Sequence, residues 1–191
     1  MAEQEQQPLT ELDAPVDERS RTGRAVSLAR LLHLECTNLL QLYKERETFL
    51  LDHTPGGERI VTLSPDSEEP STEEKVHLLH LALRQCLGLL HCVIQKEQEE
   101  WGELEADYET LKQSVCVRLQ HLLHTTKDLL QSWTVEVTPD HQCTEETDGP
   151  GGAFGLKMWT YRVLLELIHW AGHATQTLHL LHKERVGAEE V

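Results

Sequence analysis

The sequence Phe-Gly-Leu-Lys-Met-Trp at residues 154–159 begins the last amphipathic stretch of the chain, directly after a long polar loop. It is a poor start for a helix, because Lys157 opposes the positive end of the helix dipole and Gly155 costs about 1 kcal/mol relative to alanine. Local misfits of this kind often mark functional positions. Phe154 and Lys157 are spaced i, i+3, so a helix places both side chains on one face. An aromatic anchor beside a charge is typical of a binding surface.

The same stretch also fits a buried stripe. Apolar residues recur with helical spacing at Phe154, Met158, Tyr161, Leu165 and Ile168. Such periodicity indicates core more often than it indicates a binding surface. On that interpretation Lys157 is simply a solvated side chain, and spacing alone favours it.

Outward from this stretch, the prolines divide the chain. All seven prolines lie outside four long stretches, and a proline inside a helix costs about 3 kcal/mol. Each stretch carries apolar residues at the 3.6-residue period of an amphipathic helix. We therefore expect helices over about 20–51, 71–97, 104–133 and 154–185. The sequence Ser-Thr-Glu-Glu at 71–74 is a capping box that marks the start of the second helix.

The connections between these helices indicate the topology. A helix of about 30 residues is about 45 Å long, and the first and third loops, about 20 residues each, can cross that length. The link around Gly102 is short. Two long connections and one short one favour an all-α, long-chain four-helix bundle with up-up-down-down topology. That arrangement is typical of helical cytokines.

Composition and charge exclude several kinds of partner. The 191 residues suit one domain. We expect a disordered acidic tail at 1–19, a bundle at 20–185 and a C-terminal tail at 186–191. Lys and Arg total 17 against 33 Asp and Glu, a net charge of −16. Neither nucleic acid nor an anionic membrane surface is therefore an expected partner.

The N-terminus indicates where in the cell the chain is made, and the cysteines indicate which thiols are buried. The first residues are polar and have no apolar core of the kind a secretory signal peptide needs. Charged residues or histidines interrupt every apolar stretch well before the roughly 18 residues of a membrane span. We therefore expect synthesis in the cytosol and no membrane insertion. Cys36, Cys86 and Cys116 lie on or near apolar stripes and are expected to be buried thiols, whereas Cys143 is the expected exposed thiol.

Specific residues in the first and last helices match one family of helical cytokines. In the last helix these are the residues from Gly151 to Trp159, followed by Trp170 in register. In the first helix they are Leu28, Ala29, Arg30, Thr37, Leu39 and Tyr43. With these residues the chain resembles the ciliary neurotrophic factor and cardiotrophin group of the interleukin-6 family. The resemblance covers the bundle, about residues 20–185.

The resemblance implies a function and site residues. In this family the Phe and Lys of a Phe-x-x-Lys motif contact the leukaemia inhibitory factor receptor, which gives receptor-binding roles to Phe154 and Lys157. Family members bring that receptor together with the shared interleukin-6 family signal transducer. The resemblance thus implies a growth factor that signals by receptor assembly, with no enzymatic activity and no cofactor. The transducer site lies on the first and third helices in the family, and no motif there transfers to this chain.

The family also implies where the protein acts and a third partner. Export without a signal peptide is similar to ciliary neurotrophic factor, so we expect unconventional release from the cytoplasm and action outside the cell. A non-signalling receptor subunit is a further candidate partner, and Arg30 matches a basic position on the first helix, although a solvated arginine explains it equally well. Two departures count against that subunit. The chain has no tryptophan between 52 and 100, and His173 stands where the family has arginine.

Two other classes remain open, a metal-binding bundle and an intracellular helical-bundle scaffold. The Glu-x-x-His elements at 74–77 and 166–169 resemble those of di-iron helical proteins. Their histidines should lie about 15 Å apart along an antiparallel bundle and could not share one metal. His169 and His173 lack an evident third and fourth zinc ligand, so no metal site is expected. A scaffold would use the same amphipathic helices, and no phosphate loop, HExxH or nucleophile motif indicates an enzyme.

Overall fold

Four proline-free stretches form the four helices of the structure, a computed structural model that describes residues 18–48, 58–65, 67–130, 143 and 152–189. The helices are α1 (Glu18–Arg46), α2 (Thr72–Trp101), α3 (Ala106–Leu129) and α4 (Gly152–Glu189). Within these described residues the chain has no strand. The all-α prediction is therefore confirmed.

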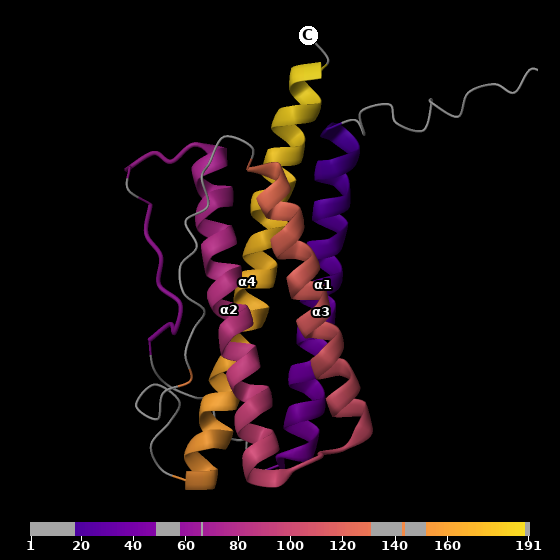
Figure 1. Ribbon diagram of the computed structural model, residues 1–191. Helices are drawn as coiled ribbons and strands as arrows, with labels where there is room; N and C mark the ends of the chain where they lie inside the picture. Colours follow the sequence, from indigo (N-terminus) through magenta and orange to yellow (C-terminus); the bar gives the residue numbers. More distant parts are fainter. Residues whose placement is uncertain (1–17, 49–57, 66, 131–142, 144–151, 190–191) are drawn as a thin grey trace, which may run out of the picture.

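The directions of the helices follow from contacts between their ends. Thr22 Oγ1 lies 2.6 Å from His182 Nδ1, so the start of α1 meets the end of α4. The Tyr43 hydroxyl donates to the Lys157 carbonyl at 2.7 Å, so the end of α1 meets the start of α4. Figure 1 shows α1 and α2 running in one direction and α3 and α4 in the other. Each helix packs against two antiparallel neighbours, which confirms the up-up-down-down bundle.

The helix ends agree with the sequence where a local signal sets them. Ser71 is the N-cap of α2, and its hydroxyl oxygen accepts a hydrogen bond from the Glu74 amide at 3.2 Å. The predicted end of that helix, residue 97, is too early. The helix continues to Trp101 because the true stop is Gly102, whose φ of +70° suits glycine. The predicted ends of the first and third helices, residues 51 and 133, are too late, since α1 ends at Arg46 and α3 at Leu129.

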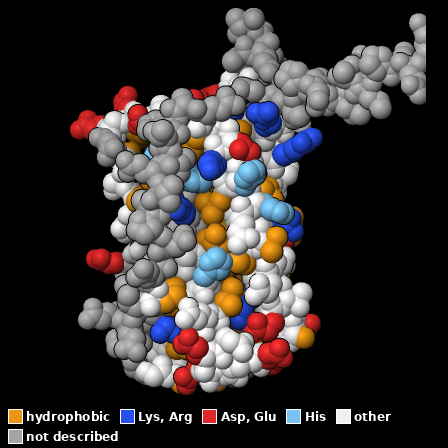
Figure 2. Space-filling view, in the orientation of Figure 1, with side chains coloured by type: hydrophobic (Ala, Val, Ile, Leu, Met, Phe, Trp, Pro, Cys, Tyr) orange, Lys and Arg blue, Asp and Glu red, His pale blue; other side chains and the backbone are white. Residues whose placement is uncertain are grey.

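The core is a continuous set of leucines and aromatic side chains from all four helices. Its largest fully buried apolar members are Tyr43, Tyr108, Leu32, Leu39, Leu79, Leu83, Leu90, Leu119, Leu122 and Leu164. In Figure 2 hydrophobic side chains remain visible as a narrow band along the middle of the face. Burial on this scale accounts for the periodic sequence, since each leucine removed from water contributes about 1.5–3 kcal/mol.

A segment of the first crossover, residues 58–65, is attached to α4. Val61 is buried, and its amide donates to Glu166 Oε1 at 3.4 Å. The same oxygen accepts from Trp170 Nε1 at 3.0 Å and lies 3.6 Å from an Arg59 guanidinium nitrogen. Glu166 therefore holds the crossover on α4.

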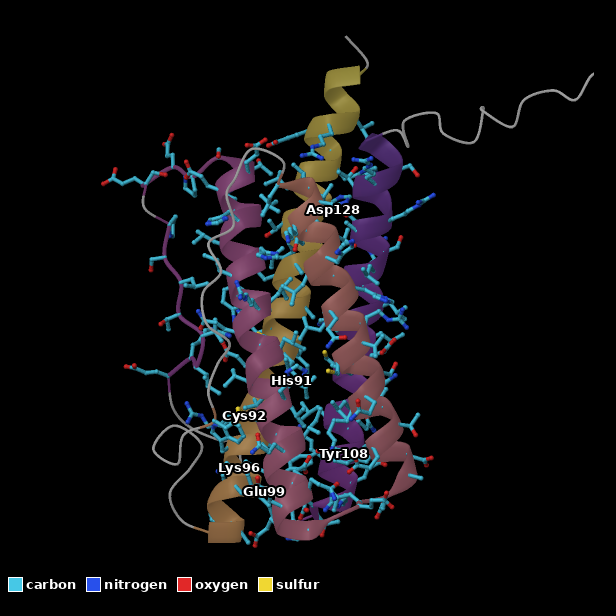
Figure 3. The ribbon with its side chains drawn as sticks, viewed as in Figure 1. His91, Cys92, Lys96, Glu99, Tyr108 and Asp128 are labelled. Atoms are coloured by element: carbon cyan, nitrogen blue, oxygen red, sulfur yellow. A yellow bond between two sulfur atoms is a disulfide. The ribbon has the colours of Figure 1, made fainter. Side chains whose placement is uncertain are left out.

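The second crossover is attached by a disulfide that the sequence did not indicate. Cys92 on α2 is bonded to Cys143, with their Cα atoms 5.6 Å apart. Figure 3 places Cys92 above Lys96 on α2. The expectation of an exposed Cys143 thiol is therefore wrong, because folding brings this loop cysteine against a helix. The other three cysteines are free and buried, as predicted.

The helix α2 is apolar enough that a membrane span must be considered beside a core helix. Among the described residues it is the one helix whose length and composition would also suit a membrane span. Half of its apolar window is buried inside the bundle. Core packing against α3 and α4 therefore explains the composition of α2.

Candidate functional site

Phe154 lies in the first turn of α4 and points away from the core. Its side chain is 59% exposed, the largest fraction among the exposed large hydrophobic residues of the described chain. The other members of its predicted stripe are buried or partly buried: Met158, Tyr161, Leu165 and Ile168. The stripe is thus mostly core, as spacing suggested, but the core interpretation is wrong for Phe154 itself.

Lys157 is held by the carboxylate of Glu47, the residue directly after α1. Its Nζ lies 2.9 Å from Glu47 Oε2, and the Glu47 side chain is only 8% exposed. The ammonium also lies 5.6 Å from the centroid of the Trp101 ring on α2. Lys157 is therefore not simply solvated. Glu47 also offsets the charge conflict that makes this lysine unfavourable near the start of α4.

The backbone of α4 is fixed at the same place. The Tyr43 hydroxyl that donates to the Lys157 carbonyl is almost fully buried. Burial, assisted by the nearby Glu97 and Glu47 carboxylates, raises the pKa of Tyr43 well above its usual value. The phenol therefore stays protonated and keeps donating at any physiological pH. Two contacts from α1 thus position Lys157.

A buried charge network lies near these contacts, at the end of the bundle where α1 and α2 end and α3 and α4 begin. We call this end of the bundle the foot. Lys112 Nζ lies 2.9 Å from Glu97 Oε1 and 3.1 Å from Glu109 Oε1. The Tyr108 hydroxyl donates to Glu97 at 2.9 Å, and the Arg46 guanidinium lies 5.4 Å from the Tyr108 ring centroid. Figure 3 shows Tyr108 near this end of α3.

Electrostatics in the foot follow from burial. Desolvation raises the pKa of the Glu97 carboxyl, and the charge of Lys112 opposes that rise. Helical periodicity did not predict this network. Its signal was Lys112, a cation that falls on the apolar stripe of α3 between Tyr108 and Val115.

Arg30 is not part of the foot. It is exposed on α1, thirteen residues before Tyr43, which is about 20 Å along a helix. The structure therefore brings Phe154 and Lys157 together on one face but leaves Arg30 well away from both. Its role in receptor binding stays a prediction.

The metal-binding alternative gains no support from the geometry. Glu166 is occupied by the crossover and by Trp170, and Glu74 accepts from the Ser67 hydroxyl at 3.0 Å. The rings of His169 and His173 stack at 6.3 Å, and burial lowers the pKa of both. No group of three or more His, Cys, Asp or Glu side chains within the described ranges is arranged to hold a metal ion.

Comparisons with known proteins converge on one family. A family model described as Ciliary neurotrophic factor matches residues 1–190. The ciliary neurotrophic factor of Mus musculus is 24% identical over 194 residues, covering 98% of this chain and 93% of the relative. That of Rattus norvegicus is 23% identical with 98% and 92% covered. That of Sus scrofa is 24% identical over 193 residues, with the same two shares covered.

Proposed function

Because the chain belongs to the ciliary neurotrophic factor family, we propose that this neurotrophic cytokine brings the leukaemia inhibitory factor receptor together with the shared interleukin-6 family signal transducer. Membership in this family of growth factors makes the chain a non-enzymatic ligand of cytokine receptors. The proposal specifies which receptors bind and where on the bundle they bind.

The exposure of Phe154 is the observation that carries the first half of the proposal. Phe154 is 59% exposed, so a partner that covers its ring removes a large apolar area from water. Such a ring in a receptor pocket is typically worth about 2–4 kcal/mol of binding free energy. Lys157 follows at i+3, so Phe154 and Lys157 form the Phe-x-x-Lys motif at the start of α4. We assign this surface to the leukaemia inhibitory factor receptor.

A second exposed surface supports the transducer assignment. Leu34 on α1 is 55% exposed and Val117 on α3 is 48% exposed. Their sequence neighbours are joined across the helix pair, since Arg118 Nη2 lies 3.0 Å from Glu35 Oε1. Exposed apolar side chains around a paired charge suit a protein interface. We assign the outer face of α1 and α3 to the shared transducer.

The disulfide supports action outside the cell. Bonds such as Cys92–Cys143 form and persist mainly in oxidising surroundings. The two receptors are displayed at the cell surface, so an extracellular ligand with this bond suits the proposal. We include Arg30 as a contact for a third, non-signalling receptor subunit, because it is exposed on α1 far from Phe154 and Lys157, one helical turn from Leu34.

The test is binding of the purified protein to the leukaemia inhibitory factor receptor ectodomain. The variant combines Phe154→Ala with Lys157→Ala, and it should bind at least about a hundredfold more weakly, near 2.7 kcal/mol. Leu180→Ala is the matched control, because Leu180 is also exposed on α4 but lies towards its far end. Failure of the folded parent to bind would refute the assignment of the leukaemia inhibitory factor receptor.

A further inference from the structure

We propose that Arg118 on α3 contacts the shared transducer directly and that Glu35 on α1 is the positioning residue that holds it. The transducer group that Arg118 meets is an uncharged oxygen acceptor within an apolar surface. The inference rests on the proposed function and deepens it, because it names the chemistry of the partner that covers the outer face of α1 and α3.

A buried carboxylate joins the two helices at this face. Glu35 is 9% exposed, and its Oε2 accepts from the Ser114 hydroxyl at 2.8 Å. Its Oε1 accepts from Arg118 Nε at 3.1 Å, and Arg118 Nη2 lies 3.0 Å from the same oxygen. Ser114 and Arg118 are one turn apart on α3. Both carboxylate oxygens are therefore bonded within the fold, which fixes the orientation of the Arg118 guanidinium.

The guanidinium keeps part of its bonding capacity for a partner. Arginine has five N–H donors in a rigid planar group, and Glu35 uses the edge formed by Nε and Nη2. Within the described ranges no other acceptor contacts Arg118, and its side chain is 29% exposed. A side chain already held at one edge loses less conformational freedom when a partner binds it. Arg118 is thus arranged to donate outward from Nη1.

Apolar side chains flank the pair on the outer face. Leu34 precedes Glu35 on α1 and is 55% exposed, whereas Val117 precedes Arg118 on α3 and is 48% exposed. Leu31 lies one turn before Glu35 and is 38% exposed. Three of the five exposed large hydrophobic residues in the described part of the chain are therefore neighbours of the pair along α1 or α3. An arginine among apolar side chains is typical of the centre of a binding surface.

The charge of the pair indicates which partner group fits. Arg118 and Glu35 together carry no net charge. A transducer carboxylate brought to Arg118 would also approach the Glu35 carboxylate, which would repel it. That carboxylate would lose its hydration among the apolar neighbours as well. An uncharged oxygen, from a main-chain carbonyl or a side-chain amide, avoids both costs and still accepts from Nη1.

Binding of the purified protein to the transducer ectodomain tests both roles. Arg118→Lys keeps the charge but loses the planar group that bonds Glu35 and a partner together, and it should weaken binding about tenfold. Glu35→Ala should weaken binding to a similar extent, because it releases Arg118. The double variant should bind about as weakly as either single variant. Unchanged affinity of Arg118→Lys overturns the inference, and additive losses overturn the positioning role of Glu35.

Two controls separate this contact from general damage to the fold. Every variant should keep the parent's affinity for the leukaemia inhibitory factor receptor ectodomain, which binds at Phe154 on the proposed function. Arg162→Met is the matched variant, because Arg162 on α4 also donates from Nη2 to an oxygen, the Glu58 carbonyl at 2.9 Å. It should bind the transducer ectodomain as the parent does. Failure of the folded parent to bind that ectodomain would overturn the transducer assignment instead.

Salt dependence tests the charge of the partner group. Glu35→Gln removes the negative charge but keeps an amide oxygen that can accept from Arg118. With an uncharged acceptor, this variant and the parent should lose affinity equally between about 50 and about 500 mM salt. A transducer carboxylate would instead make Glu35→Gln bind more tightly than the parent at low salt, with the gain lost at high salt. That result would contradict the inference.

Discussion

At the residue scale, Phe154 and Lys157 share one face of α4 but have different surroundings. Phe154 is mostly exposed, whereas Lys157 is paired with Glu47 across the bundle. The spacing of these two residues predicted their shared face. It could not predict the pairing, because Glu47 is 110 positions away in the sequence and only the fold brings it near.

The buried pair of Lys112 and Glu97 yields a stability prediction. Lys112→Met should lower the free energy of unfolding by about 3 kcal/mol, because it leaves Glu97 buried and unpaired. Adding Glu97→Gln should recover most of that loss, since an amide carries no charge and its oxygen still accepts from Tyr108. Urea unfolding at neutral pH measures both. Equal unfolding midpoints for the parent and Lys112→Met would contradict the account.

His80 yields a prediction about pH. It is buried, with its Nδ1 2.7 Å from the Thr126 hydroxyl oxygen. Burial, with smaller contributions from the Arg84, His77 and Lys127 charges, lowers the pKa of His80 to about 4. The unfolded chain therefore binds the proton first, and stability falls as pH decreases from about 6.5 towards about 4.

A His80→Gln variant isolates this effect from other groups. Between pH 7 and pH 4 the parent should lose about 2 kcal/mol more stability than the variant, allowing for partial solvent screening. His169 and His173 act in the same direction and Glu97 in the opposite one, and all three are common to both proteins. Parallel pH profiles of unfolding free energy would show that His80 is not the titrating group.

At the element scale, the helices follow local signals and the crossovers do not. Prolines and apolar periodicity predicted the four helices, and Ser71 predicted the start of α2. The attachment of both crossovers was not predictable, because it depends on contacts that only folding creates. Val61 meets Glu166 in one case, and Cys92 meets Cys143 in the other.

The disulfide yields a prediction at this scale. It closes a loop with a sequence separation of 51 residues, so reduction should lower the free energy of unfolding by about 3–4 kcal/mol. The Cys143→Ser variant should show the same loss. A reducing agent should destabilise the parent but leave that variant unchanged. If the reducing agent destabilised both proteins equally, the prediction that this disulfide stabilises the fold would be wrong.

At the scale of the whole molecule, the bundle keeps its two proposed receptor surfaces apart. Phe154 marks the foot, and Leu34 and Val117 mark the outer face of α1 and α3. The up-up-down-down topology accounts for this separation, since it places the start of α4 beside the end of α1. Topology was predictable from loop lengths, whereas the residues of the second surface were not, because no sequence motif distinguishes them.

On the proposed function, one chain binds two different receptors at once. Light scattering coupled to size exclusion measures it directly, with the protein, the leukaemia inhibitory factor receptor ectodomain and the transducer ectodomain in one mixture. We predict a complex that contains all three, which Phe154→Ala weakens by releasing the first receptor and Leu34→Ala with Val117→Ala weakens by releasing the second. Complexes that never contain more than one receptor per chain would contradict the account.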